Sequence, residues 1–345
     1  MNNDEGRADR LSAWFSGDDT AGARAEAVLV QSGGDLRTLA ASGLCAPGAQ
    51  VFSDGPAEDL DGTGLRHVPV EGGVEHAGDE LILSGGLYVQ VFDYGSLPFL
   101  SVAGPTVVRV MSPEDHDAFL DDADRAVQEG AWPEGLAHAS VQLADVGTLV
   151  APARRAALGR LFVTAGGQVR TGVGGADLGA VEQGPDALLS VLADHGGDPS
   201  LDAVVPRERT VAAATARPWL ERYARALDIR RRLTPKWGPD IRISGFGGRF
   251  TPGPAALPVE DATHPLLVRT ADAAYAVPSA GNRMFRLGTG AALLLEVFAT
   301  ASDGTGTAEA AERAGQLLDI APTEALEAYH GVVAGLAGRT TGAGR

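Results

Sequence analysis

The predicted order of strands and helices near the C-terminus constrains the fold more than any other feature of this chain. Three short apolar strands precede three helices: the strands are Pro265–Thr270, Ala274–Val277 and Arg283–Leu287, and the helices are Gly290–Ala299, Ala308–Asp319 and Pro322–Gly338. A module of this order buries one face of its sheet under helices and leaves a strand edge beside the last helix. Such an edge can take in an extended peptide as an added strand, so the pattern favours peptide recognition over catalysis.

Turn and cap residues support the same boundaries. Ser279–Asn282 supplies Gly and Asn for the turn between the second and third strands. Thr289 and Thr307 are suitable N-caps for the first two helices, and Pro322 suits the first position of the third. The first helix begins shortly after the third strand, which keeps the two close together.

The preceding residues predict mixed α/β structure. Apolar runs predict strands at Ala27–Gln31, Gln50–Phe52, Glu80–Leu83, Leu87–Phe92 and Thr106–Met111, and a hairpin from Arg160–Thr164 and Gln168–Thr171. A Ser112-Pro-Glu-Asp start predicts a helix that runs to about Glu129. Two more helices are expected at Pro185–His195 and Pro218–Arg232.

We therefore expect an α+β, multi-domain protein, in which a winged-helix-like β-β-β-α-α-α module follows a mixed α/β N-terminal region. The predicted divisions are a flexible N-terminus at 1–24, an α/β region at 25–139, an α+β region at 140–250, a Pro/Gly linker at 251–262, the module at 263–338 and a flexible tail at 339–345.

Charge and cysteine content narrow the classes of function. The 345-residue chain carries 45 acidic against 28 basic residues, a formal net charge of −17, which disfavours general binding to nucleic acid. Cys45 is the single cysteine, as expected in a reducing compartment. The acidic N-terminus lacks the pattern of a signal peptide, and no apolar run is long enough to span a membrane. We expect a cytoplasmic protein without membrane contact.

No local motif predicts catalysis, a cofactor or a metal. The clusters Gly172–Asp177 and Gly245–Phe250 lack the third small residue of a dinucleotide fingerprint, so we interpret both as turns. The seven histidines form no metal-binding pair on one helical face. Carboxylates cluster on a helix that we expect to be solvent-exposed, at Asp115, Asp117, Asp121 and Asp122.

One dense basic segment contrasts with the acidic whole. It contains Arg230–Arg232, Lys236, Arg242 and Arg249, with Trp237, Phe246 and Phe250 interleaved. Such a cluster is most often a solvated face or a helix C-terminus, and a contact surface for an acidic partner is the alternative.

The C-terminal module resembles the PqqD-like RiPP recognition element. The resemblance covers about a fifth of the chain and rests on Met284–Glu296, Thr307–Ala311 and Asp319–Ala325. It implies that the leader of a ribosomally synthesised, post-translationally modified peptide adds to the third strand and packs against the third helix. Carried over to this sequence, the implied peptide-binding residues are Arg283, Met284, Phe285, Arg286, Leu287, Leu326, Tyr329, His330 and Val333. Ala321 stands where that family often has a polar helix cap.

The overall layout is similar to the recognition proteins of daptide biosynthesis. That similarity implies a protein that is not itself an enzyme and that presents the precursor to separate partners: an oxidative decarboxylase, an aminotransferase and a methyltransferase. Any cofactor would then belong to those enzymes.

Two other classes remain open. A winged-helix DNA-binding regulator shares the helical trio, but 265–338 contains four arginines against eight acids, a net of 4 − 8 = −4. An enzyme whose active site lies within 25–250 is the other alternative, since catalytic residues can converge without a local motif.

Overall fold

The chain folds into two compact units of mixed α and β structure. The computed structural model describes residues 3–17, 22–83, 87–154, 157–252, 263–279, 283–301 and 306–341. Helices and mixed sheets are both present, so the α+β class is confirmed. The first unit consists of 1–120 and 134–216, and the second consists of 121–133 and 217–345.

A ten-stranded sheet forms the first unit. Its spatial order is β10-β9-β8-β1-β2-β3-β4-β5-β6-β7. The strands are β1 (Ala25–Val30), β2 (Cys45–Ser53), β3 (Arg66–Gly72), β4 (Glu80–Leu83), β5 (Leu87–Asp93), β6 (Thr106–Arg109), β7 (Val141–Leu143), β8 (Arg160–Val163), β9 (Gln168–Arg170) and β10 (Gly179–Ala180). The order shows that the predicted boundary between 139 and 140 is wrong, because β8 pairs directly with β1.

Strand direction changes four times across this sheet, on both sides of β9 and on both sides of β4. β8, β1, β2 and β3 run parallel, β4 is antiparallel to both β3 and β5, and β5, β6 and β7 run parallel again. The predicted hairpin is confirmed as antiparallel β8 and β9. β3 was not predicted: Val68 and Val70 are its buried residues, and Pro69 between them, which disfavours a strand, lies on the exposed side.

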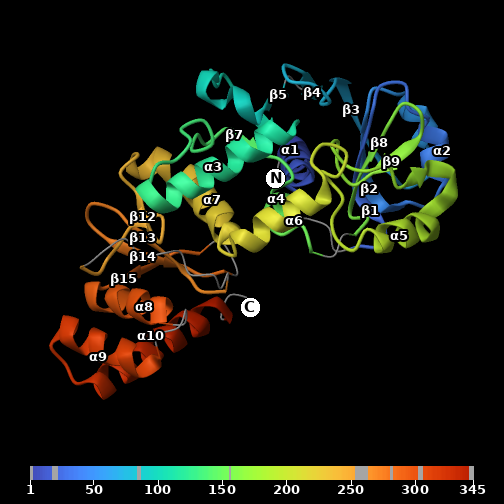
Figure 1. Cartoon of the computed structure of the whole chain (residues 1–345). Coiled ribbons are helices and arrows are strands. Elements are labelled where there is room, and N and C mark those ends of the chain that lie inside the picture. The colour runs from blue at the N-terminus through green and yellow to red at the C-terminus, as the bar shows by residue number, and fades with distance from the viewer. Residues whose placement is uncertain are drawn as a thin grey trace. The chain divides into compact units, whose positions relative to one another are not determined.

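Helices cover the sheet and connect its strands (Figure 1). They are α1 (Asn3–Ser16), α2 (Leu36–Ala41), the first part of α3 (Pro113–Glu129), α4 (Val146–Val150), α5 (Gly184–Asp194) and α6 (Arg207–Ala216), with 3-10 turns η1 (Ala57–Leu60), η2 (Tyr94–Phe99) and η3 (Val181–Gln183). β1 is buried on both faces: Leu29 belongs to one apolar cluster and Val28 to another, which also contains Leu36 of α2. This two-sided burial explains why Ala27–Val30 of β1 is a continuous apolar run.

The predicted flexible N-terminus at 1–24 is wrong for the part that forms α1. Leu11, Trp14 and Phe15 are each 2% exposed and belong to the same cluster as Leu29. Their spacing places them on one helical face, so burying them against the sheet holds the helix although most of its other residues are polar.

The start of α3 confirms the predicted cap. Ser112 Oγ accepts a hydrogen bond of 3.1 Å from the Asp115 amide. The prediction that Asp115 is solvent-exposed is wrong, because its side chain is 7% exposed and accepts hydrogen bonds from the amides of Met111 (2.8 Å) and Gly95 (2.9 Å). This carboxylate therefore fixes a loop to the helix start.

Cys45 at the start of β2 leads to a testable prediction. Burial raises the pKa of its thiol to about 12. Because only the thiolate reacts readily, we expect iodoacetamide at pH 8 to alkylate the native protein at least about 100-fold more slowly than the urea-unfolded protein. The raised pKa also contributes stability that is present below about pH 9 and is lost as the pH rises towards 12. Equal alkylation rates in the native and unfolded protein would show that burial does not protect the Cys45 thiol.

The second unit contains a five-stranded sheet in the order β12-β11-β13-β14-β15. Its elements are α7 (Leu220–Trp237), β11 (Arg242–Ser244), β12 (Gly247–Gly248), β13 (Leu266–Arg269), β14 (Ala274–Val277), β15 (Phe285–Leu287), α8 (Thr289–Ala301), α9 (Thr307–Leu318) and α10 (Pro322–Thr341). The predicted boundary near 250 is therefore wrong: β11 hydrogen-bonds to β13, so residues assigned to the middle region complete the C-terminal sheet.

Two termini in this unit differ from prediction. α7 continues beyond Arg232 through Pro235, and Gly238 with φ 75° ends it. α10 extends to Thr341, so the predicted tail at 339–345 is helical at its start. The predicted linker at 251–262 lies largely outside the described residues.

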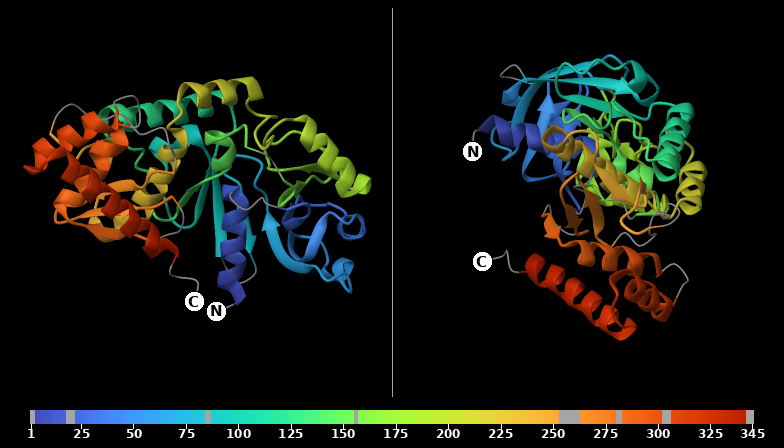
Figure 2. Two further views of the ribbon diagram at one scale, coloured as in Figure 1. Left: turned by 90° about the horizontal axis from the view of Figure 1, so that it is seen from below. Right: turned by 90° about the vertical axis from the view of Figure 1, so that its left-hand side faces the viewer.

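Helices α8, α9 and α10 lie together on one side of the β13–β15 strands (Figures 1 and 2). α8, α9 and α10 share an apolar cluster, in which the rings of Phe298 and Tyr329 stack with centroids 4.2 Å apart. A second cluster joins Leu267, Ala276 and Leu287 of the sheet to Leu295 of α8 and Leu336 of α10.

The first glycine cluster forms a turn, as predicted, whereas the second turns at Gly245 and then forms the short strand β12 (Gly247–Gly248), so that part of the prediction is wrong. In the second, Gly247 has φ 66°, and a Cβ there would lie 2.2 Å from the Cα of Gly130. A side chain at this position is therefore excluded both by backbone conformation and by space.

Candidate functional site

Strand β15 forms one edge of the sheet in the second unit. It pairs antiparallel with β14, with Ala276 opposite Phe285 and Ala274 opposite Leu287. β13, the first of the three predicted strands, has its other side occupied by β11. Within the described residues, β15 is therefore the strand of that trio that keeps an unpaired edge.

The pairing register assigns the side chains of β15 to the two faces of the sheet. Phe285 and Leu287 share a face with Leu267 and Ala276, the face that packs against α8 and α10. Arg286 lies opposite Tyr275 on the other face. Phe285 and Leu287 are half-buried, whereas Arg286 is exposed, as alternation across a sheet requires.

An apolar cavity of about 350 Å³ lies on the helix-covered face. Leu267 of β13, Leu295 and Ala299 of α8, and Tyr329 and Leu336 of α10 contribute to its lining. The residues at its remaining boundary are Thr263, His264, Pro265, Pro278, Ser279, Val333 and Ala337. This volume is of the size that holds a large side chain of a bound peptide.

The cavity and the edge strand lie along one row of paired residues. Leu267, which lines the cavity, is opposite Ala276, and Ala276 is opposite Phe285 of β15. Ala276 is fully buried and its side chain is small. The row therefore leads across the sheet from the cavity to the edge.

Tyr329 is held in place by its stacking on Phe298. Burial raises the pKa of its phenol above the usual value. The hydroxyl thus stays protonated near neutral pH and can donate one hydrogen bond at the cavity wall.

The structure brings some of the predicted site residues together and separates others. Tyr329 and Val333 line the cavity, and Val333 is 40% exposed. Leu326 instead packs into the cluster between α8 and α9, and His330 is exposed, with its ring centroid 5.7 Å from that of Tyr329. Arg283 and Met284 precede the strand, which begins at Phe285.

The cavity also uses residues that were not predicted as site residues. Leu295 and Ala299 have the i, i+4 spacing that identifies the core face of α8, but core and cavity wall have the same sequence pattern. Pro278 and Ser279 lie just after β14, and no pattern in the sequence marks them as site residues.

A buried carboxylate supports the sheet next to this cavity. Glu296 of α8 is 2% exposed. It accepts hydrogen bonds from the amides of Phe250 (2.9 Å) and Thr251 (2.6 Å) and from the hydroxyl of Ser244 (2.5 Å). Glu296 therefore anchors both β11 and the chain that follows β12 to α8.

The basic segment is largely satisfied within the second unit. Arg230 donates to the carbonyls of Ile241 (2.6 Å) and Pro239 (2.8 Å), and Arg231 and Arg232 pair with Asp228. Phe246 is 2% exposed. These contacts agree with the interpretation of Arg230–Arg232 as the C-terminal end of a helix. Because these side chains bond within the unit, the basic segment does not form one continuous surface for an acidic partner.

In the first unit, a ligand would be expected at the carboxyl end of β1. The chain adds strands on one side of β1 first (β2) and on its other side later (β8), so the strand order reverses there. Asp35 occupies the N-cap position of α2 and accepts hydrogen bonds from the amides of Arg37 (2.9 Å) and Thr38 (3.1 Å). The cavity lined by Gln31 and Asp54 there has a volume of about 10 Å³. That cavity has room for about one water molecule.

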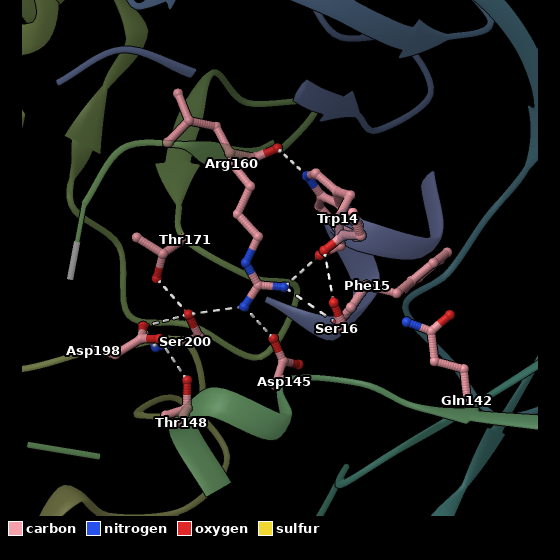
Figure 3. Close-up of polar contacts among 12 residues, drawn as sticks. Trp14, Phe15, Ser16, Gln142, Asp145, Thr148, Arg160, Thr171, Asp198 and Ser200 are labelled. Atoms are coloured by element: carbon pink, nitrogen blue, oxygen red, sulfur yellow. Dashed lines mark hydrogen bonds and ion pairs between the residues drawn. The ribbon is translucent and has the colours of Figure 1, made fainter. Parts of the chain in front are cut away.

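A buried polar network surrounds Arg160 at the start of β8 (Figure 3). Its guanidinium donates to the carbonyl of Trp14 (2.6 Å), to Asp145 (2.5 Å) and to the hydroxyl of Ser200 (3.2 Å). The Ser200 hydroxyl lies 2.5 Å from Asp198, which accepts a 2.7 Å hydrogen bond from Thr148.

This network explains how the N-terminal helix is attached. Arg160 is 3% exposed and caps the carbonyls at the end of α1, where a cation is favoured. Ser200 is fully buried, so its hydroxyl is not positioned to meet a substrate. A separate contact between a hydroxyl and an imidazole, Ser53 to His67 at 3.0 Å, also involves a buried serine, which is 1% exposed.

Comparison with known proteins adds no assignment: no protein-family model, curated protein or solved structure matches this chain. In the ranges that the structure describes, no helix is both long and apolar enough to cross a membrane, and no three His, Cys, Asp or Glu side chains are grouped as a metal site.

Proposed function

We propose that the second unit binds the leader segment of a ribosomally synthesised peptide precursor as an added antiparallel strand on β15. The observation that carries the proposal is the unpaired edge of β15, whose Phe285 and Leu287 lie on the same face of the sheet as an apolar cavity between β13 and α10, two strands away. Main-chain hydrogen bonds to the edge would supply affinity, and the cavity would select a side chain. The order of strands and helices in this unit is the one on which the resemblance to PqqD-like recognition elements rests.

The expected affinity is modest. β15 has three residues, and about three strand-to-strand hydrogen bonds contribute about 1 kcal/mol each. One buried apolar side chain adds about 1.5–3 kcal/mol, and a further contact with Phe285 or Leu287 adds a similar amount. Ordering the peptide removes part of this gain, which leaves a dissociation constant of tens of micromolar or weaker. Such a complex can release its cargo after modification.

In this proposal the chain does not perform the chemistry. It presents the precursor to separate enzymes, which in a daptide-type pathway are an oxidative decarboxylase, an aminotransferase and a methyltransferase. Cofactors would be bound by those partners. The cytoplasmic location stays a prediction from composition.

Fluorescence polarisation tests the proposal. Any short open reading frames beside the gene are taken as candidate precursors, and the N-terminal halves of their products are synthesised with a fluorescein label. We expect one of them to bind, and we expect Phe285→Asp and Tyr329→Asp each to weaken binding at least about tenfold, since each places a charge in an apolar contact.

The matched control is Ile82→Asp, which changes an exposed apolar residue (42% exposed) in the first unit and should leave binding unchanged. Circular dichroism must show that all three variants stay folded. If no candidate leader binds at about 100 µM, or if both groove variants bind as tightly as the unchanged protein, leader recognition at this edge is rejected.

A further inference from the structure

The second-unit sheet carries exposed arginines in an acidic protein: Arg286 on the edge strand β15, Arg283 just before it, and Arg242 and Arg269 on the inner strands β11 and β13. Arg242, Arg269, Arg283 and Arg286 are all exposed, and none of the four takes part in an ion pair among the residues that the structure describes. Arg242 and Arg269 lie directly opposite each other on adjacent antiparallel strands. The register places that pair on the face of Leu287, whereas Arg286 lies on the other face, so Arg286 is the arginine that a guest carboxylate on that face would meet.

Arg286 lies at the end of a row of aromatic and basic side chains. Tyr275, its partner across the strands, stacks on Trp237 with ring centroids 4.9 Å apart and planes at 20°. The ammonium of Lys236 lies 5.4 Å from the Trp237 ring centroid. The row places cations at both ends of an aromatic stack, on the sheet face opposite the cavity.

The register determines how a guest strand would meet these two faces. Side chains of adjacent strands that lie opposite each other point to the same face. Guest residues opposite Phe285 and Leu287 would therefore point towards α10, and the guest residue between them would point to the side of Arg286. Apolar contacts on one face thus alternate with a basic contact on the other.

From this alternation we infer that the chain selects an acidic extended peptide in which apolar residues alternate with Glu or Asp, the carboxylates facing Arg286. This inference rests on the proposed strand addition and specifies its ligand class. Each exposed pair between a guest carboxylate and an arginine changes affinity by about twofold to fivefold, and salt weakens it. A lysine in place of the glutamate exchanges an attractive pair with Arg286 for a repulsive one, so acidic and basic peptides should differ in affinity by about fourfold to 25-fold.

Three designed probes test the inference without knowledge of the precursor. The first is a fluorescein-labelled peptide with the core Leu-Glu-Val-Glu-Leu-Glu between Gly-Ser ends, the second has lysine for every glutamate, and the third groups the same residues as Leu-Leu-Val-Glu-Glu-Glu. We expect the full-length protein to bind the alternating acidic probe at least about fourfold more tightly than the lysine probe and the grouped probe.

Charge reversal provides the second arm. Arg286→Glu is expected to remove or reverse the preference for the acidic over the lysine probe, and Arg286→Gln should give an intermediate result. The matched control is Arg313→Glu, which makes the same charge change on an exposed residue of α9 and should leave the preference intact. Circular dichroism confirms that each variant is folded.

The outcomes separate the two proposals. Equal binding of the acidic and lysine probes, or a preference that survives Arg286→Glu, overturns the acidic selectivity and leaves strand addition standing. If none of the probes binds at up to about 1 mM, both the selectivity and strand addition of generic sequences at β15 are rejected.

Discussion

Replacement of Arg160 by methionine is expected to lower the free energy of unfolding of the first unit by about 3–5 kcal/mol. The guanidinium is 3% exposed and pairs with Asp145, which is 4% exposed, so methionine would leave a buried carboxylate without its cation. The end of α1 would also lose the donor that satisfies its Trp14 carbonyl. Urea unfolding followed by circular dichroism measures the change.

Hydrogen exchange locates the effect. We expect amides of α1 and of the strand that begins at Arg160 to exchange faster in the variant, because both meet in the network of Figure 3. The matched control is Arg170→Met, which breaks a partly exposed ion pair with Asp177 and should cost at most about 1 kcal/mol.

A double variant tests the electrostatic cause. Adding Asp145→Asn to Arg160→Met removes the unpaired buried charge and should recover part of the lost free energy of unfolding. If the two changes were independent structural defects, their losses of free energy would instead add. A loss of less than about 1 kcal/mol in Arg160→Met would show that the network does not support the first unit.

Replacement of Glu296 by alanine is expected to lower the free energy of unfolding of the second unit by about 3–5 kcal/mol. The change leaves the amides of Phe250 and Thr251 and the Ser244 hydroxyl without their acceptor, at about 1–3 kcal/mol for each buried donor that water cannot reach. Because Glu296 anchors β11 to α8, the variant should also weaken peptide binding by disturbing the β13 side of the cavity.

Two single changes refine that measurement. Ser244→Ala removes one donor and keeps the carboxylate, so it should cost about 1 kcal/mol. Glu312→Ala changes an exposed glutamate of α9 and should have almost no effect. If Glu296→Ala is no more destabilising than Glu312→Ala, the buried carboxylate is not an anchor.

Much of the second unit could be predicted from local pattern. β14 has the predicted bounds, and α9 and α10 begin within one residue of their predicted starts. These predictions rest on signals within a few residues, such as Pro322 at the first helical position and the apolar spacing of Tyr329 and Leu336. α3 likewise has its predicted limits, because Ser112 and Gly130 mark both ends.

The errors concern residues whose role depends on distant partners. α1 has few apolar residues, yet Trp14 and Phe15 are buried because a sheet more than a hundred residues away reaches them through Leu161 and Arg160. Asp115 has the sequence context of an exposed acid, but a loop amide from Gly95 turns it into a buried acceptor. The cavity lining is similar: Leu295 and Leu336 have ordinary core spacing, and their sequence positions do not show that a space is left between them.

Helix starts, turns and the β-β-β-α-α-α order follow from residues close together in the chain, because capping, backbone preference and apolar periodicity act over a few positions. Tertiary packing decided that β11 occupies one side of β13 and that β15 keeps its edge. It also decided that Tyr329 faces a cavity while Leu326, three residues earlier, does not. Strand pairing and cavity formation depend on which surfaces meet in space, and those contacts join residues that no short-range rule connects.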